Sequence, residues 1–460
     1  MKKYTLYIIL FFVWTNYSNA QGFRIEVKTP DLSVDSLFIY GYDYNKKAFR
    51  PVYGIKYATE AIFTDNNYLL PGLYSINADS HIVIEFLISK YTNQQFSIVL
   101  KNNDAIFYGS DENNANMQYM KTIREFSQQM ALLNANYQKI QQSSESFMEK
   151  QIKADEIIRQ SQAINAQKLS YQAQVVEENK GNLLASIILS IMEVPQPPAD
   201  YYKDRIRYYK YLAEHHFSKY DFSDDRILYT PLANNKFRAF NEIIYELDAQ
   251  DAIPYVLSAL RKSYQVSPQQ YSDLFDCLER NFGDIKSPVR KEPLYIAMLR
   301  HAIDSTRIDE YRKIRYLYEL NTIDKNHAGE KLPNFNLIMS NGDTTNLYDI
   351  ASEHLLLFLQ NPDCPTCKKV REKLKEMEVA LSTQKITVLT VYFEDNKNLW
   401  QNYLQNNAYP HWKHGWNYDL TIEEKKLIDV RSIPTLYLLD KDKIIRKKDI
   451  DIHELEAILK

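Results

Sequence analysis

One short segment, Leu355–Lys369, constrains this chain more than any other. It reads LLLFLQNPDCPTCKK, an apolar run typical of a buried strand, then a polar corner, then Cys364-Pro365-Thr366-Cys367. Beyond it, apolar residues at spacings of 4, 3 and 4 predict the buried face of a helix, namely Val370, Leu374, Met377 and Leu381. The sequence therefore predicts a strand, a C-x-x-C turn and a helix in that order.

Two cysteines at the start of a helix suit thiol-disulfide exchange. The positive end of the helix dipole favours a thiolate on Cys364. We therefore expect Cys364 to attack a substrate disulfide and Cys367 to resolve the mixed disulfide.

A structural disulfide and half of a zinc site are the alternatives. Zinc would need further ligands, and the only other cysteine is Cys277. Lys368 stands where haem attachment requires His. We expect no metal and no cofactor.

The N-terminus has the pattern of a secretory signal. Lys2 and Lys3 precede an apolar run over residues 4–14, and small residues end at Ala20. We expect cleavage between Ala20 and Gln21, export to the periplasm or cell envelope, and no transmembrane span in the mature chain. A retained membrane anchor is the alternative, although the run is short for spanning a bilayer.

Length and composition indicate an exported globular protein of several domains. A chain of 460 residues suggests about three domains, and 45% apolar with 25% charged residues is a globular balance. The net charge of −3 excludes a global basic field for nucleic acid. Three cysteines are few for an oxidising compartment, which makes the C-x-x-C pair stand out. Cys277 falls on an apolar helix face, so we expect a buried core thiol; a third redox partner is the alternative.

The distribution of residue types along the sequence predicts a multidomain chain. We expect an N-terminal antiparallel β domain, a central all-α region and a C-terminal α/β domain. Six short runs rich in β-branched and aromatic residues predict a sandwich or small barrel in the first of these. The predicted boundaries are 1–20 for the signal peptide, 21–110 for the β domain, 111–194 for a helical arm, 195–323 for a helical bundle and 324–460 for the α/β domain.

The helical region begins with two long helices. Heptad spacing over residues 126–140 predicts the first, a break is expected at 143–145, and the second should run to about Asn179. The pair can form an antiparallel arm or a dimer-forming coil, and the oligomeric state stays open. After a proline cluster at 195–198, five or six further helices are expected, with breaks near Pro231, Pro254, Pro268, Pro288 and Pro293.

The last 130 or so residues resemble a thioredoxin domain. The resemblance rests on the strand, C-x-x-C turn and helix, on Ile433-Pro434-Thr435, and on a closing hairpin with its helix. It implies that Pro434 is cis and faces the cysteines, and that the backbone of Ile433 and Thr435 binds a substrate strand. The lead-in Gly329-x-x-x-Pro333-x-Phe335 resembles the TlpA-like envelope disulfide reductases, and the whole chain resembles multidomain members from Gram-negative bacteria.

That resemblance implies a function. It indicates an exported disulfide reductase whose substrates are envelope protein disulfides, including apocytochromes c before haem attachment, and whose electrons come from a membrane thiol-disulfide donor. A disulfide oxidase or isomerase is the nearest alternative. A non-catalytic envelope protein that binds glycan or protein ligands, with a structural C-x-x-C disulfide, is the alternative from another class.

The chain also departs from the thioredoxin pattern. Phe358 stands where that family has a buried Asp, and Asp363 where it has a Trp. Asp363 should disfavour the neighbouring thiolate, Lys368 should favour it, and Pro365 removes one N–H that could bond the sulfur. We include these residues, with Thr366 inside the motif, among those that tune the site.

An insert of roughly 40 residues between Phe393 and Pro434 is the second departure. It carries Trp400, Trp412 and Trp416. We expect part of it to wall the active-site cleft, and a surface flap packed on the sheet is the alternative.

Overall fold

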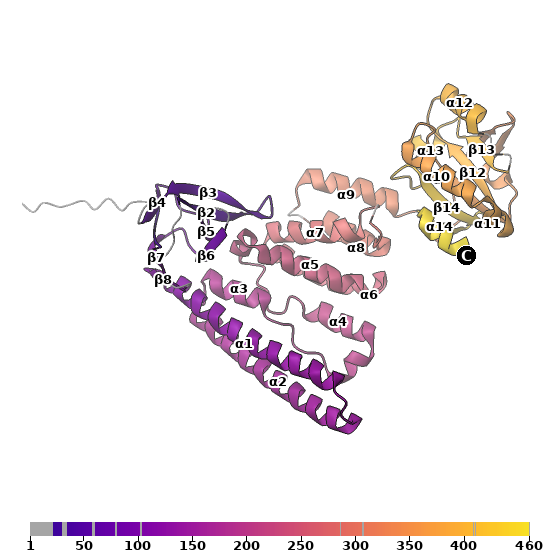
Figure 1. Ribbon diagram of the computed structural model, residues 1–460. Helices are drawn as coiled ribbons and strands as arrows, with labels where there is room; N and C mark the ends of the chain where they lie inside the picture. Colours follow the sequence, from indigo (N-terminus) through magenta and orange to yellow (C-terminus); the bar gives the residue numbers. More distant parts are fainter. Residues whose placement is uncertain are drawn as a thin grey trace, which may run out of the picture. The chain divides into compact units, whose positions relative to one another are not determined.

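The computed structural model describes residues 22–29, 35–57, 60–78, 81–101, 104–285, 287–305, 308–407, 409 and 411–459 (Figure 1). The predicted signal peptide, residues 1–20, lies outside these. The chain forms two compact units, Met1–Ile244 with Lys262–Asp273, and Tyr245–Arg261 with Leu274–Lys460. Among the described helices, none combines the length and apolar character that a membrane span needs.

Among its described residues, the N-terminal domain contains eight strands: β1 (Phe23–Lys28), β2 (Ser36–Asp43), β3 (Ala48–Lys56), β4 (Ala61–Asp65), β5 (Gly72–Ala78), β6 (His81–Ile88), β7 (Gln95–Lys101) and β8 (Asp104–Tyr108). They form two sheets, in the orders β4-β1-β7-β8 and β3-β2-β5-β6. Buried apolar residues of both sheets share one core, with Ile25 and Val27 of β1 beside Leu37 and Ile39 of β2. This is the packing of a β-sandwich.

The predicted fold class is confirmed, with one refinement in this domain. β1 and β7 pair in parallel, with Arg24 opposite Gln95, while the other strand pairs are antiparallel. The six predicted runs also missed two strands, β8 and β3, of which β3 contains Pro51 and Gly54. β3 is an edge strand, and Pro51 lies next to an irregularity in its pairing with β2, where a missing N–H is tolerated.

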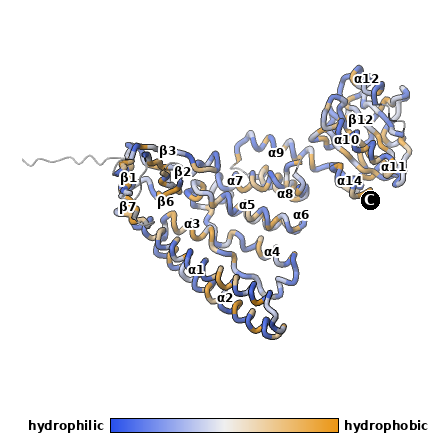
Figure 2. The backbone as a smooth tube through the Cα atoms, in the orientation of Figure 1, coloured by the Kyte–Doolittle hydropathy of each residue, from blue (hydrophilic) through white to orange (hydrophobic). Residues whose placement is uncertain are grey.

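Two long helices follow the sandwich, as the heptad spacing predicts. α1 (Asp111–Gln142) and α2 (Phe147–Glu178) contact each other along the chain's own hairpin, which supports the intramolecular arm. Hydrophilic and hydrophobic residues alternate along both helices (Figure 2). A capping box starts α2, because the Ser146 hydroxyl accepts from the Glu149 N–H and Glu149 accepts from the Ser146 N–H.

The remaining helices are α3 (Leu183–Ile191), α4 (Arg205–His215), α5 (Pro231–Tyr245), α6 (Ala249–Val266), α7 (Pro268–Phe282), α8 (Glu292–Ile303) and α9 (Glu310–Ile323), with 3-10 turns η1 (Ala199–Lys203) and η2 (Asp225–Tyr229). Pro231 and Pro268 begin helices, where a missing N–H costs nothing. Pro254 lies inside α6, so the predicted break there is wrong. Cys277 is buried in α7, as expected.

The C-terminal α/β domain contains β9 (Asn336–Met339), β10 (Thr344–Asn346), η3 (Leu347–Asp349), β11 (His354–Leu359), α10 (Pro365–Glu376), α11 (Glu378–Thr383), β12 (Ile386–Tyr392), α12 (Lys397–Asn407), β13 (Lys413–Trp416), α13 (Thr421–Glu424), β14 (Thr435–Asp440), β15 (Ile445–Lys448) and α14 (Ile452–Leu459). Its sheet has the order β10-β9-β13-β12-β11-β14-β15. The central strand β11 is buried on both faces, with Leu357 in one core and Phe358 in the other. β11 therefore delivers the C-x-x-C turn from the middle of the sheet.

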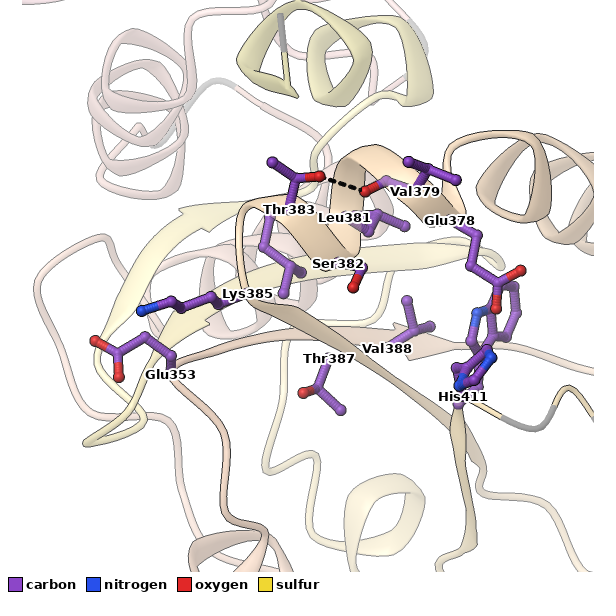
Figure 3. A pocket seen from close by; sticks show the side chains of 12 residues that line it. Glu353, Glu378, Val379, Leu381, Ser382, Thr383, Lys385, Thr387, Val388 and His411 are labelled. Carbon is purple, nitrogen blue, oxygen red and sulfur yellow. Dashed lines mark hydrogen bonds between the residues drawn. The ribbon is translucent and has the colours of Figure 1, made fainter.

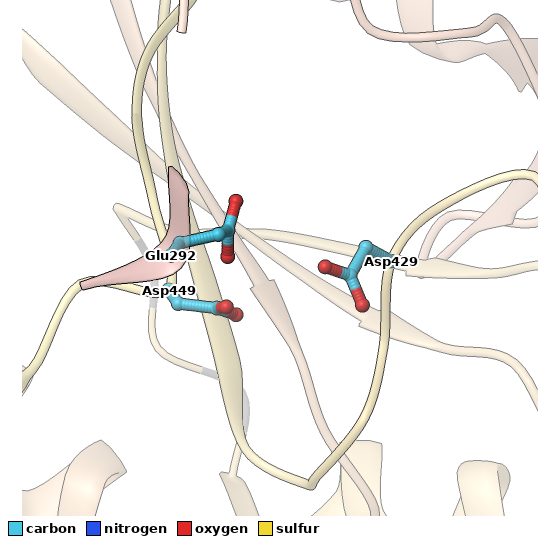
Figure 4. Close-up of side chains that lie close together, drawn as sticks. All are labelled: Glu292, Asp429 and Asp449. Atoms are coloured by element: carbon cyan, nitrogen blue, oxygen red, sulfur yellow. The ribbon is translucent and has the colours of Figure 1, made fainter. Parts of the chain in front are cut away.

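A network of six charged side chains connects the start of α8 with this sheet, all within one unit. Three carboxylates lie close together, those of Glu292, Asp429 and Asp449 (Figure 4). Lys448 Nζ lies 2.8 Å from Asp429 Oδ2 and 3.2 Å from Glu292 Oε1. Arg290 and Arg431 contact Asp449 at 3.0 and 2.7 Å. Three cations thus balance three anions, and the cluster is an ion-pair network.

Candidate functional site

The two cysteines of the motif lie in different environments. Cys364 is the N-cap residue of α10, directly after the β11 turn, and is partly exposed. Cys367, one turn along, is fully buried. The Cys367 N–H donates to Cys364 Sγ at 3.3 Å. One sulfur therefore faces solvent at a helix N-terminus, and the other is enclosed beneath it.

The pKa values of the two thiols shift in opposite directions. Burial opposes ionisation of Cys364, but hydrogen bonds from Cys367 and the Thr366 N–H, with the positive charge of Arg371, hold its pKa below the usual range. Burial raises the pKa of Cys367 to about 12. Cys364 is therefore the better nucleophile, and Cys367 has the character of a resolving thiol.

The segment before β14 lies against the exposed sulfur. Cys364 Sγ is 3.8 Å from the carbonyl oxygen of Ile433, and the Ile433–Pro434 peptide bond is cis. Thr435 begins β14 and pairs with Leu359 at the end of β11. The structure thus brings Ile433 to Cys364, with Pro434 and Thr435 following in the same segment.

The four residues predicted to tune the site lie at the protein surface. Asp363, Pro365, Thr366 and Lys368 are all exposed, and the Asp363 N–H donates to Asn361 Oδ1 at 2.8 Å. Thr366 lowers the pKa of Cys364 through its backbone N–H, not through its side chain. The charged side chain that lowers the pKa of Cys364 is Arg371, which the sequence analysis did not single out.

Arg371 lies beneath the motif with only 4% of its surface exposed. Its guanidinium donates to Gln360 Oε1 and, at 3.3 Å, to the Pro362 carbonyl oxygen. The guanidinium carbon is 5.2 Å from the ring centroid of Tyr403. The signal for it was present in the sequence, because Arg371 follows Cys367 by four residues and therefore shares its helix face.

Comparisons with known proteins bear on the fold of this domain. A family described as "Thioredoxin-like" matches residues 352–445, and one described as "Domain of unknown function (DUF5106)" matches residues 159–326. A solved thioredoxin-like protein from Bacteroides caccae ATCC 43185 is 26% identical, with a TM-score of 0.53, over 58% of this chain and 98% of that chain. The C-terminal domain has a thioredoxin-like fold. No curated protein matches the chain.

Two further solved structures match over less of the chain. The C-terminal domain of an uncharacterized protein from Bacteroides fragilis NCTC 9343 is 34% identical, over 29% of this chain and 97% of that chain, with a TM-score of 0.28. A domain of a possible thiol-disulfide isomerase from Cytophaga hutchinsonii ATCC 33406 is 25% identical, over 29% and 90%, with a TM-score of 0.27. The B. caccae match, at 58%, extends beyond the thioredoxin-like domain.

The insert of the thioredoxin-like domain forms part of its sheet. It supplies α12, β13 and α13, and β13 pairs with β12 and β9. Trp412 and Trp416 are each only 7% exposed and pack in separate apolar clusters. Both tryptophans are therefore core residues of the domain. That another part of the insert walls the active-site cleft stays a prediction.

A separate hollow lies beside α11 and β12 of the thioredoxin-like domain. Its volume is about 660 Å³, and Figure 3 shows Glu353, Lys385, Glu378 and His411 around it. Neither cysteine lines it. It is therefore distinct from the thiol site.

His414 gives the thioredoxin-like domain a pH-dependent stability. It is buried, its Nδ1 lies 2.7 Å from the Thr390 hydroxyl, and burial lowers its pKa to about 4. Because the unfolded chain binds a proton near pH 6.5 and the folded one does not, stability is complete above that pH and falls as the pH drops toward 4. At pH 5 we expect His414→Gln to recover about 1 to 2 kcal/mol of this loss.

Urea denaturation at pH 7 and pH 5 measures that effect. The exposed His411 provides the control, because His411→Gln should leave the pH dependence as in wild type. An equal loss of stability in wild type and His414→Gln would contradict the assignment.

Proposed function

We propose that the chain is an exported thiol-disulfide oxidoreductase that reduces disulfides of envelope proteins. The observation that carries the proposal is the asymmetry of the two thiols: an accessible Cys364 with a lowered pKa above a buried Cys367 with a raised one. The thioredoxin-like fold of the C-terminal domain supports it. The signal-like N-terminus supports export.

The reaction follows from the roles of the two sulfurs. The Cys364 thiolate attacks a substrate disulfide, which forms a mixed disulfide and releases one substrate thiolate. Cys367 then attacks Cys364 Sγ, which closes the Cys364–Cys367 disulfide and releases the second substrate thiol. The substrate gains two electrons, the enzyme pair loses two, and a membrane thiol-disulfide donor would reduce the pair again.

The substrate edge would be the segment before β14. In this proposal, backbone groups at Ile433 and Thr435, on either side of Pro434, would pair with an extended polypeptide, which the 3.8 Å distance between Cys364 Sγ and the Ile433 carbonyl oxygen supports. Envelope proteins with unwanted disulfides, including apocytochromes c, fit such a site. This substrate class is implied by the TlpA-like resemblance.

A disulfide oxidase or isomerase is the second candidate, and one observation favours it. A lowered pKa of Cys364 stabilises the dithiol form relative to the disulfide, which makes a C-x-x-C pair more oxidising. The equilibrium of the Cys364/Cys367 pair with glutathione buffers decides the direction. A strongly reducing potential would support the proposed reductase. A potential near that of known oxidases would support the oxidase or isomerase instead.

Insulin reduction by dithiothreitol tests the proposed activity. Wild type should accelerate insulin precipitation, and Cys364→Ser should reduce the rate to that of dithiothreitol alone, because the attacking thiolate is gone. Cys277→Ser is the matched control, since Cys277 is buried in α7 and should not be needed. Equal rates with wild type and Cys364→Ser would favour a non-catalytic binding protein.

A further inference from the structure

Arg371 is a buried cation that forms no ion pair with any described residue. Within the described part of the chain, its guanidinium contacts the amide oxygen of Gln360, the carbonyl oxygen of Pro362 and the ring of Tyr403, and no carboxylate. Arginine does not lose its proton in proteins, so its charge persists below the motif. A buried charge without a counterion is costly and calls for an explanation.

The neighbouring thiols can provide the negative charge that Arg371 lacks. Arg371 follows Cys367 by four residues on α10, so both side chains project from one face of the helix into the domain. Its charge lowers the pKa of Cys367 and that of Cys364. An anion on either sulfur is therefore stabilised by the same guanidinium.

We propose that Arg371 is a positioning residue that stabilises the Cys367 thiolate in the second step of the exchange. This role rests on the proposed function. Once Cys364 is bound to substrate, its sulfur carries no charge, and the anion that must form is on the buried Cys367. Arg371 is the buried cation one helical turn beyond Cys367 on α10.

The step balances without another reactant. Cys367 gives up its proton to solvent, its thiolate forms the bond to Cys364 Sγ, and the bond between Cys364 and the substrate sulfur breaks. The departing sulfur takes the bonding electron pair and then a proton from solvent. Arg371 neither accepts nor donates a proton, because it acts only through its fixed charge.

This arrangement differs in kind from a buried carboxylate. Phe358, at the position where thioredoxins have a buried Asp, is fully buried in the same apolar cluster as Cys367 and cannot take the proton of that thiol. A fixed cation instead lowers the cost of the thiolate itself. The predicted signature is a pH dependence of the second step that follows the charge at residue 371.

The test uses oxidised glutathione as the disulfide and follows the glutathione adduct on Cys364. Samples are quenched with acid and the intact protein is weighed by mass spectrometry at several pH values. In Arg371→Met the adduct should decay about tenfold more slowly than in wild type at pH 7, because one pKa unit changes the thiolate fraction tenfold. The pH profile of the decay should move to higher pH, and Arg371→Lys should restore most of the rate.

Two controls keep the result interpretable. Lys373→Met removes a charge from the exposed face of α10 and should leave adduct decay unchanged. Where Arg371→Met does not fold, Gln360→Glu keeps the arginine and places a carboxylate against it, which should slow adduct decay in the same direction.

The outcomes separate this inference from the proposed function. The role of Arg371 would be overturned if the adduct in folded Arg371→Met decayed at the wild-type rate and with the wild-type pH profile. Failure of glutathione disulfide to oxidise the Cys364–Cys367 pair of wild type, or adduct formation that survives in Cys364→Ser, would instead overturn the proposed function.

Discussion

Cys367→Ser is expected to convert a transient mixed disulfide into one that accumulates. Cys364 still lies at the N-terminus of α10, where its pKa is lowered, and can still attack a substrate disulfide. No second thiol remains to release the substrate. With a disulfide-bonded protein such as insulin, most of the variant should run as a covalent adduct on a non-reducing gel. Wild type should show little adduct under the same conditions.

The matched variants define what the adduct means. Cys364→Ser should form none, because the buried Cys367 has a pKa raised to about 12 and no access to a protein substrate. Cys277→Ser combined with Cys367→Ser should still form it. A stable adduct on Cys367 in the Cys364→Ser variant would reverse the two roles.

Lys448→Met should destabilise the protein more than other single charge removals. Lys448 is 7% exposed in its side chain and contacts both Asp429, which is fully buried, and Glu292. Without the ammonium group, the buried Asp429 and the partly buried Glu292 lose a shared cation, although Arg431 still contacts both. We therefore expect a cost at the lower end for a broken buried ion pair, about 3 kcal/mol. Chemical denaturation followed by tryptophan fluorescence measures the change in the free energy of unfolding.

The adjacent residue is the control for that experiment. Lys447 is 45% exposed and pairs with Glu454 at the surface, so Lys447→Met should cost less than about 1 kcal/mol. Similar small losses for both variants would mean that the network contributes little net stability. In that case, the desolvation of its charges would offset their attraction.

Short-range patterns carried the sequence analysis of the thiol site. β11, the two cysteines and the start of α10 lie within one continuous segment, and their apolar periodicity and the helix-starting Pro365 are visible in the residues themselves. Local sequence patterns predicted the last elements, β14, β15 and α14, equally well. Their local propensity and their place in the tertiary structure agree.

The misjudged features all depend on contacts that periodicity does not reveal. The insert was expected to wall the cleft or to form a surface flap, yet β13, which follows Trp412 and ends at Trp416, joins the sheet, and both tryptophans are buried. The parallel pairing of β1 with β7 joins strands that no hairpin connects. Pro254 is tolerated within α6, although proline often ends a helix.

The sequence by itself determined which atoms can react: two thiols three residues apart, presented by a strand to a helix N-terminus. Only the tertiary structure decided what surrounds them. It encloses Cys367, brings the Ile433 carbonyl oxygen to Cys364 across 69 residues, and places the charge of Arg371 below both sulfurs. The physical reason is that reactivity resides in side-chain chemistry, whereas a thiol's pKa depends on burial and on charges contributed by distant segments.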